Sequence, residues 1–343
     1  MSACYVGYQN SQIRWRINVN VLITGRLPDS VVERVRKIHN VTCHGSERPM
    51  PREKVLEYVA GKEGLLCMIT DTVDPVLLDC ASSLKMIANY GVGYDHIDVP
   101  AVSERGILVS NTPGVLTAAT ADLAMALILA VGRRVVAGDA RTRRGDFKFW
   151  SPMHFLGREI TGKTLGLIGL GRIGKAVAKR AVGFDMRIVY YSRHRLSSED
   201  EDRMGVSYRS LPDLLGEADY VSLHVSLSDE TRHLIGEKEL GQMKSSAFLI
   251  NTSRGPVVDE AALVTALKAH RIAGAGLDVY ENEPELVPGL ADQENAILLP
   301  HVGSATIDTR TRMAELAVDN LLAGLAGRRP PNCLNWEQVA DKK

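Results

Sequence analysis

The chain has 343 residues, of which 45% are hydrophobic and 24% are charged, and its 41 basic and 41 acidic residues give a formal net charge of zero. This length suggests two globular domains with substantial cores, and the balanced charge argues against a nucleic-acid-binding protein, which would carry a basic surplus. Five scattered cysteines without a Cys-x-x-Cys pair, no signal-peptide core, and no apolar stretch long enough to span a membrane predict a cytoplasmic protein with neither disulfides, a metal site nor membrane contact.

Short β-rich runs alternate with helical patterns through the first third of the chain. Because strands that alternate with helices usually pair in parallel, this pattern predicts a parallel sheet covered by helices on both faces. Residues before about Asn18 are polar and aperiodic, and they predict only a loose extension. The expected strands are residues 20–25, 65–70, 84–90 and 107–112, and the expected helices are residues 28–38 and two that start near Pro51 and Asp74.

A single long helix is expected at residues 117–144, because Leu123, Leu127, Val131 and Val135 recur at helical spacing. Several arginines between residues 133 and 144 favour a solvated helix face or a subunit contact over a nucleic-acid site, given the neutral total charge. The following residues, 145–162, are aromatic and irregular, which predicts a segment that packs against another surface.

A second alternating series follows, and it ends in a helix at about residues 305–324. Six strands with intervening helices match a full dinucleotide-binding sheet. The last helix has no strand after it, so we expect it to return to the first domain and make that domain discontinuous. The six expected strands are residues 164–170, 187–193, 220–225, 247–253, 273–279 and 296–302.

The most specific local motif is Gly169-Leu170-Gly171-Arg172-Ile173-Gly174. It follows an apolar strand and opens an amphipathic helix, which is the context that a dinucleotide-binding loop requires. We expect Gly169 to allow the tight turn, Gly171 to let the backbone approach the pyrophosphate, and Gly174 to let helix and strand pack closely. The helix start offers free N–H groups and a positive dipole end to the phosphates. The alternative is a glycine-rich turn in a fold that binds no ligand.

The end of the next strand bears on the choice of cofactor. NAD-binding proteins usually carry an Asp or Glu about 20 residues on, where it binds the ribose 2′-hydroxyl, but this chain has Tyr190-Tyr191-Ser192-Arg193-His194-Arg195. Ser192 can donate to a 2′-phosphate, and Arg193 or Arg195 can pair with its charge. The sequence therefore predicts that NADP(H) is preferred and that NAD(H) is possible. The alternative is that these arginines only decorate a surface loop.

Three polar residues, Arg254, Glu283 and His301, follow expected strands at their carboxyl ends, where open α/β sheets bind ligands. Reduction of a ketone by hydride leaves an alkoxide that needs a proton, and an imidazole is suited to donate it near neutral pH. A nearby carboxylate favours the imidazolium, and a guanidinium can grip a substrate carboxylate and polarise the carbonyl. These needs match the three residues as a catalytic set, although each of them alone could have a structural role.

Ordered motifs from about Leu65 to Gly327 carry a family resemblance. They are the glycine loop and the segments 89–98, 111–117, 251–255, 276–279, 283–284 and 300–306. With these motifs the chain resembles the D-isomer-specific 2-hydroxyacid dehydrogenases, and within that family it is most similar to the glyoxylate/hydroxypyruvate reductases. One departure is Ser226, where the family commonly has proline after the pair His224-Val225.

The resemblance implies an α/β fold of two Rossmann-like domains. A flavodoxin-like substrate-binding domain would combine residues 18–112 and 305–335, and a doubly wound NAD(P)-binding domain at residues 113–304 would be inserted in it. A small 2-oxo acid would bind through the backbone amides of Val92 and Gly93, with Arg254 and His301 beside them. Homodimers would form through the long helix and the following loop, from which Trp150 and Met153 would reach the partner's site. The further cofactor contacts that it implies are Thr117, His224, Thr231, Thr252, Asp278 and Gly303.

Three functional hypotheses follow from these observations. The first is a reductase that converts glyoxylate or hydroxypyruvate to the D-2-hydroxy acid, with His301 as the proton donor. The second is a dehydrogenase for a larger 2-oxo acid. The third is a non-enzymatic, nucleotide-sensing binding module, similar to corepressors that resemble this family. The intact set of Arg254, Glu283 and His301 favours catalysis.

Overall fold

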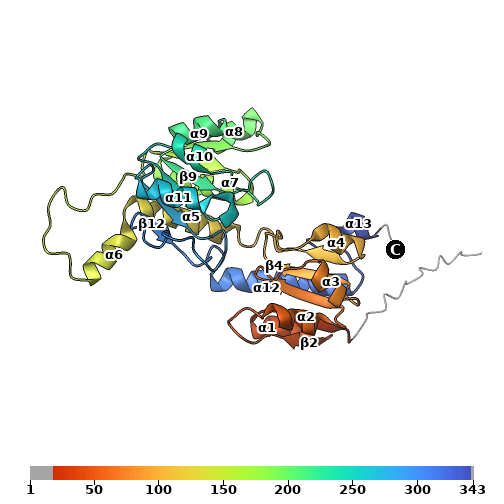
Figure 1. The fold of residues 1–343 in the computed structure, drawn as a ribbon. Helices are drawn as coiled ribbons and strands as arrows, with labels where there is room; N and C mark the ends of the chain where they lie inside the picture. Colours follow the sequence, from red (N-terminus) through yellow and green to blue (C-terminus); the bar gives the residue numbers. More distant parts are fainter. Residues whose placement is uncertain (1–17, 341–343) are drawn as a thin grey trace, which may run out of the picture. The chain divides into compact units, whose positions relative to one another are not determined.

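The computed structural model describes residues 18–340, and the chain divides into two compact units. Unit 1 comprises the residues up to Pro113 together with those from Thr311 onward, and unit 2 is Gly114–Arg310 (Figure 1). Each unit contains one parallel sheet with helices around it, so the expected α/β class with two Rossmann-like sheets is confirmed. None of the helices between residues 18 and 340 is long and apolar enough to cross a membrane.

Unit 1 has a five-stranded parallel sheet in the order β2-β1-β3-β4-β5, which is the flavodoxin-like order. Its strands are β1 (Asn20–Ile23), β2 (Asn40–Cys43), β3 (Gly64–Met68), β4 (Met86–Tyr90) and β5 (Leu108–Ser110). Its helices are α1 (Asp29–Arg36), α2 (Arg52–Val59), α3 (Pro75–Cys80), α4 (Val99–Glu104), most of α12 (Ile307–Leu325) and α13 (Trp336–Ala340).

The carboxyl-terminal segment is an integral part of the unit 1 core. A Cβ on Gly64 of β3 would lie 3.0 Å from the Leu325 side chain, and Gly324 of α12 lies directly against Met86. Glycine therefore allows the last long helix to approach the sheet closely. In the structure the segment from Thr311 onward, which includes most of this helix, falls in unit 1 with the residues up to Pro113.

Unit 2 has a seven-stranded parallel sheet in the order β12-β11-β10-β9-β6-β7-β8. Counted within the unit, this is the doubly wound order 3-2-1-4-5-6 with one further strand at the edge. Its strands are β6 (Thr164–Ile168), β7 (Arg187–Tyr191), β8 (Val206–Tyr208), β9 (Tyr220–Leu223), β10 (Phe248–Asn251), β11 (Gly274–Leu277) and β12 (Ala296–Leu298). Its helices are α5 (Thr117–Gly132), α6 (Val135–Arg143), α7 (Arg172–Ala181), η1 (Val182–Phe184), α8 (Ser198–Met204), α9 (Leu211–Glu217), α10 (Glu237–Gln242), η2 (Gly255–Val257) and α11 (Glu260–Lys268).

The expected single helix at residues 117–144 is wrong, because the chain breaks between α5 and α6. Arg134 adopts a left-handed conformation with φ of 55°. The carbonyl of Gly132, which would accept the next helical hydrogen bond, instead accepts one from the amide of Arg158 at 2.7 Å. A distant segment thus ends α5 by binding its last carbonyl group. The periodicity of apolar residues alone could not indicate this end point.

Two strands were missed, and both lie at sheet edges. β2 (Asn40–Cys43) contains polar residues and is only partly buried, and β8 (Val206–Tyr208) has three residues. An edge strand pairs on one side only, so its sequence needs less of the apolar pattern that marks a central strand. The second sheet therefore has seven strands instead of the six expected.

Candidate active site

The three expected catalytic residues of unit 2 follow neighbouring strands. Arg254 comes after β10, Glu283 after β11 and His301 after β12, and these strands pair in parallel in that order. Because the carboxyl ends of parallel strands meet at the same edge of a sheet, the three segments converge there.

Glu283 and His301 form a direct pair. The Glu283 Oε2 atom lies 2.7 Å from Nδ1 of His301, and both side chains keep about a third of their surface exposed, 34% and 29%. With Nδ1 bound to the carboxylate, Nε2 lies on the other side of the ring. The arrangement orients the imidazole through one nitrogen and leaves the other for proton transfer.

His301 is held in an uncommon backbone conformation. Its φ is 51°, in the left-handed region that non-glycine residues rarely adopt. The two carboxylate oxygens of Asp278 accept hydrogen bonds from the next two amides, those of Val302 and Gly303, at 2.7 Å each. Asp278 thereby stabilises the turn that presents the imidazole. Burial raises the pKa of Asp278, and these two amides oppose that effect.

The Glu283 carboxyl is biased toward its ionised form. Partial burial opposes ionisation, but the hydrogen bond and charge of His301, the amide of Tyr280 and the charge of Arg254 together lower the pKa of Glu283 below its usual value. The Tyr280 amide donates to Oε1 at 3.0 Å. Arg254 is thus electrostatically coupled to the pair.

The turn that carries Arg254 is held by Asn251 at the end of β10. The Asn251 Nδ2 group donates to the carbonyl of Arg254 at 2.9 Å, and its Oδ1 accepts from the amide of Ser253 at 3.0 Å. Arg254 was predicted as a site residue, whereas Asn251, which directly precedes Thr252-Ser253-Arg254, was not. Asn251 could have been identified as a turn-stabilising residue because it is a short polar residue at the end of an apolar strand.

The glycine loop has the steric features of a dinucleotide cradle. Gly169 has φ of +93°, and a Cβ there would lie 2.5 Å from the carbonyl oxygen of His224, the residue that follows β9. A Cβ on Gly174 would lie 2.3 Å from the carbonyl of Gly169, whereas one on Gly171 would meet nothing within 4 Å. Gly169 and Gly174 thus permit close packing, and Gly171 leaves the backbone open to an approaching ligand.

The helix behind this loop leaves its first amides available. No side chain caps the start of α7, whose N-cap is Gly171, and the first amides of any helix lack intrahelical partners. The loop lies between β6 and β9, the point at which the strand order reverses. The Thr252 hydroxyl, buried near the carboxyl end of β10, has no hydrogen-bond partner in the described structure. These features fit a dinucleotide along this edge of the sheet.

His224 lies beside the glycine loop and is paired with a buried serine. Its Nε2 lies 2.9 Å from the Ser222 Oγ atom, and burial lowers the pKa of His224 to about 4. The ring is therefore neutral at physiological pH. Thr231, in the loop that follows, donates its hydroxyl proton to the carbonyl of Ser226 at 2.7 Å.

The chain also matches known proteins over most of its length. Residues 125–303 match the family model of the D-isomer specific 2-hydroxyacid dehydrogenase, NAD binding domain. A glyoxylate reductase of Thermococcus litoralis is 50% identical over 319 residues, which cover 92% of this chain and 96% of that protein. The chain belongs to the D-isomer specific 2-hydroxyacid dehydrogenase family. It is therefore an oxidoreductase with a nicotinamide-dinucleotide-binding domain.

Solved structures similar to this chain share its fold. A Thermus thermophilus protein is 49% identical with a TM-score of 0.86, and it covers 92% of this chain and 99% of its own. An NADPH-dependent glyoxylate/hydroxypyruvate reductase of Sinorhizobium meliloti, solved with NADP and malonate, is 33% identical with a TM-score of 0.83. That match covers 94% of this chain and 98% of the other.

In this dehydrogenase the two arginines after β7 differ in their contacts. Arg195 binds Glu201 in bidentate fashion at 2.8 and 2.9 Å and lies over the ring of Tyr208. Arg193 has only an exposed contact with Glu230 at 3.4 Å. Of the two guanidiniums, Arg193 is the one without a strong partner, and it directly follows Ser192 at the end of β7.

In unit 1 the loop after β4 turns its carbonyl groups inward. The Asn89 side chain donates to the carbonyls of Gly91 and Gly93 at 3.2 and 2.8 Å, and Asn111 donates to that of Val92 at 2.8 Å. The amides of Val92 and Gly93 donate to no residue within the described part of the chain. Two neighbouring free N–H groups are a suitable site for a carboxylate.

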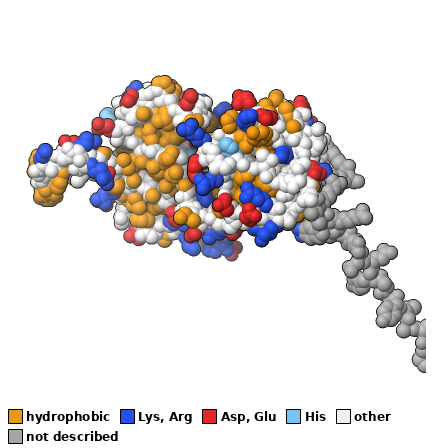
Figure 2. All heavy atoms as spheres, turned by 90° about the horizontal axis from the view of Figure 1, so that it is seen from below, with side chains coloured by type: hydrophobic (Ala, Val, Ile, Leu, Met, Phe, Trp, Pro, Cys, Tyr) orange, Lys and Arg blue, Asp and Glu red, His pale blue; other side chains and the backbone are white. Residues whose placement is uncertain are grey.

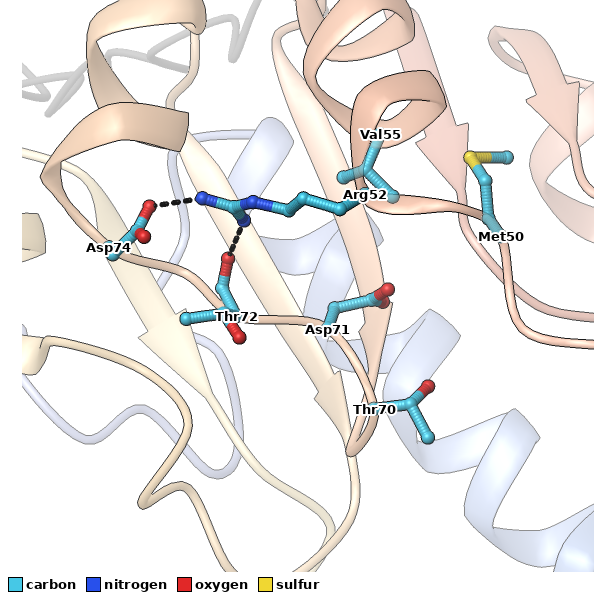
Figure 3. Close-up of a pocket in the computed structure, with 7 residues that line it drawn as sticks. All are labelled: Met50, Arg52, Val55, Thr70, Asp71, Thr72 and Asp74. Atoms are coloured by element: carbon cyan, nitrogen blue, oxygen red, sulfur yellow. Dashed lines mark hydrogen bonds and ion pairs between the residues drawn. The ribbon is translucent and has the colours of Figure 1, made fainter. Parts of the chain in front are cut away.

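A cavity of about 280 Å³ in unit 1 contains none of the expected site residues. Arg52 spans it and donates to the Asp74 carboxylate at 2.5 Å and to the carbonyl of Thr72 (Figure 3). Asp71 accepts hydrogen bonds from Thr24 and from the Met68 amide, and burial raises its pKa. These pairs connect the ends of β1 and β3 to the start of α2, so we assign them a structural role.

The segment from α6 to residue 157 carries exposed apolar side chains. It extends from the rest of unit 2 in Figure 1, and Figure 2 shows hydrophobic side chains on it and on the adjoining face of that unit. No residue of α6 is buried, and the Trp150 and Met153 side chains are 77% and 79% exposed. The exposed members of this apolar arm are Val135, Val136, Phe147, Phe149, Trp150, Met153 and Leu156.

Proposed function

We propose that the protein reduces a small 2-oxo acid, glyoxylate or hydroxypyruvate, to the corresponding D-2-hydroxy acid, with NADPH as the preferred reductant. The Glu283–His301 pair at the carboxyl end of the unit 2 sheet, in a chain half identical to a glyoxylate reductase, is the observation that carries this proposal. The overall change consumes one hydride and one proton for each carbonyl reduced. The bound nicotinamide supplies the hydride.

The residues of the chain supply the proton and the charge stabilisation. His301 donates a proton from Nε2 to the carbonyl oxygen, and Glu283 stabilises the imidazolium before transfer and orients the ring. Arg254 polarises the carbonyl and binds the substrate carboxylate. The family resemblance assigns the free amides of Val92 and Gly93 to binding a substrate carboxylate. The small loop that carries them suits a short substrate.

The residues around the glycine loop would hold the cofactor. The amides of Leu170, Arg172 and Ile173, which lie between the loop glycines, would bind the pyrophosphate. Thr252, Asp278 and Gly303 would contact the nicotinamide side. Further contacts would come from Thr117, His224 and Thr231.

The preference for NADPH rests on the end of β7. Ser192 can donate a hydrogen bond to the 2′-phosphate, and Arg193 can neutralise its charge, because Glu230 holds this guanidinium only weakly. No carboxylate occupies the position that would bind a ribose 2′-hydroxyl in NAD-specific proteins.

We also propose that two copies associate through the apolar arm. A contiguous set of exposed aromatic and aliphatic side chains on a projecting segment is typical of an interaction surface. Trp150 or Met153 would then reach the partner's active site. Light scattering should give a dimer mass for the wild type, and the double variant Trp150→Ser, Met153→Ser should shift it toward the monomer.

Initial-rate kinetics test the enzymatic proposal. Glyoxylate and hydroxypyruvate should be turned over with NADPH, and kcat/KM should be lower with NADH and with bulkier 2-oxo acids. A higher kcat/KM for a bulky 2-oxo acid would identify a dehydrogenase of another substrate class. Tight cofactor binding without turnover of any 2-oxo acid would instead support a nucleotide-sensing binding module.

A further inference from the structure

The loop that carries Glu283 has little burial of its own. Its central residues, 282–286, are all exposed, and only a short bridge between Asn282 and Glu285 connects them internally. An exposed loop of this kind would ordinarily sample many conformations. Proton donation by His301 nevertheless requires the Glu283 carboxylate to stay at its 2.7 Å hydrogen-bond distance.

A buried acid, Glu260, binds the start of the loop and influences its end. Only 3% of Glu260 is exposed, and its Oε1 atom accepts a hydrogen bond from the amide of Glu281 at 2.9 Å. The backbone of Val287, at the other end of the loop, acts to lower the pKa of the same carboxylate. Glu281 lies two residues before Glu283, so this side chain holds the start of the segment that presents Glu283.

The attachment is reciprocal and involves the neighbouring catalytic turn. The Glu281 carboxylate accepts a hydrogen bond from the Glu260 amide at 2.8 Å and lies 3.3 Å from Nε2 of His233. Beside it, Gly255 packs so closely on the loop that a Cβ there would lie 1.8 Å from the carbonyl carbon of Tyr280. The segments that follow β10 and β11 therefore contact each other directly where Glu260 lies.

The usual reason for an acid at the start of a helix does not explain Glu260. Asp259 already caps α11, since its side chain accepts the Ala262 amide at 2.9 Å. Burying a carboxylate is costly unless it is well bonded, and burial together with the charge of Glu281 raises the pKa of Glu260. Glu260 is buried despite this desolvation cost, and its carboxylate accepts a hydrogen bond from the loop. These two facts point to a role in holding that loop.

We propose that Glu260 is a positioning residue for the reduction: it holds the 281–287 loop so that Glu283 stays bonded to His301. This inference rests on the proposed function. Glu260→Ala removes both acceptors. Glu260→Gln keeps one acceptor oxygen but replaces the other with an amide donor, which weakens the attachment to the loop.

Steady-state kinetics with glyoxylate and NADPH separate positioning from general damage. The Gln variant should lower kcat roughly tenfold and the Ala variant further, with the KM for NADPH within about twofold of wild type. The matched control is Glu237→Gln, because Glu237 is also the first residue of a unit 2 helix but is exposed. It should leave both parameters unchanged. A kcat within twofold of wild type in both Glu260 variants would overturn the proposal.

Hydrogen exchange gives a readout that does not depend on turnover. Amides of residues 281–287 should exchange faster in Glu260→Gln, while those of the glycine loop should keep their wild-type rates. Uniformly faster exchange across unit 2, or no change at 281–287, would contradict a positioning role. If the wild type reduces no 2-oxo acid, the proposed function fails, and exchange at 281–287 still decides the question for Glu260. Should the Ala variant not fold, the Gln variant serves both measurements.

Discussion

The glycine loop and the catalytic set occupy the same edge of the unit 2 sheet but are built in different ways. The glycine loop is one continuous segment, and its shape depends on backbone sterics at Gly169 and Gly174. The catalytic set comes from three segments after β10, β11 and β12, which Asn251, Glu260 and Asp278 hold through hydrogen bonds to backbone groups. A cradle for a cofactor can be local, whereas a set of reacting side chains must be assembled.

The largest expected effect concerns the assembled set. His301→Asn should lower kcat about 10³-fold, because general acid catalysis contributes about 10² to 10⁴, while the dissociation constant of NADPH should change less than about twofold. Asparagine tolerates the left-handed backbone. The control is His270→Asn, since His270 is an exposed histidine of unit 2 that also has φ near 50°. Turnover that survives in the His301 variant would show that the proton comes from elsewhere.

Two alanine substitutions in the glycine loop should have opposite consequences. Gly174→Ala places a methyl group against a backbone carbonyl and should cost about 1–3 kcal/mol of unfolding free energy. Gly171→Ala meets no protein atom, so the unfolding free energy should hold while the dissociation constant for NADPH rises about tenfold.

Urea denaturation and fluorescence titration measure these two effects. Gly183→Ala is the control for both, because a Cβ at Gly183 also meets nothing within 4 Å and that residue lies outside the loop. Equal loss of stability in the Gly171 and Gly174 variants would remove the distinction between a packing glycine and a ligand-facing one.

The partly buried imidazole of His224 beside the loop predicts a dependence of stability on pH. The pKa of His224 falls to about 4 in the folded protein, against about 6.5 when unfolded. The unfolded chain therefore takes up a proton first as pH falls below about 6.5, and folding loses about 2 kcal/mol between pH 7.5 and pH 5 from this residue. In His224→Gln the same acid shift should cost correspondingly less. Parallel curves for both proteins would show that His224 does not couple to folding.

The smallest expected effect is on cofactor choice. Arg193→Ala should raise the KM for NADPH roughly tenfold, about 1.4 kcal/mol, and change that for NADH less than about twofold. Arg203→Ala is the matched control, because this exposed arginine on α8 pairs with Asp200 of the same helix. Equal losses with NADPH and NADH would remove the basis for the proposed preference.

The contiguous motifs and central strands were accessible from sequence. The glycine loop lies within six residues between a buried strand and an amphipathic helix, and the ends of β10, β11 and β12 follow apolar runs. Three features were not accessible from sequence. They are the end of α5, the edge strands β2 and β8, and the ion pair between Arg195 and Glu201. Each of these features depends on a partner from elsewhere in the chain. At the end of α5, for example, the Arg158 amide donates a hydrogen bond to the carbonyl of Gly132.

The sequence by itself determined the family, the parallel α/β architecture and the identity of the loop glycines, because local periodicity and backbone sterics act over a few residues. Only the tertiary structure decided that Asp278 supports the His301 turn and that Glu260 holds the loop of Glu283. Both acids bond to backbone amides, which every residue but proline carries, so no residue type at the receiving position marks the contact. Such contacts exist only once folding has brought distant segments together.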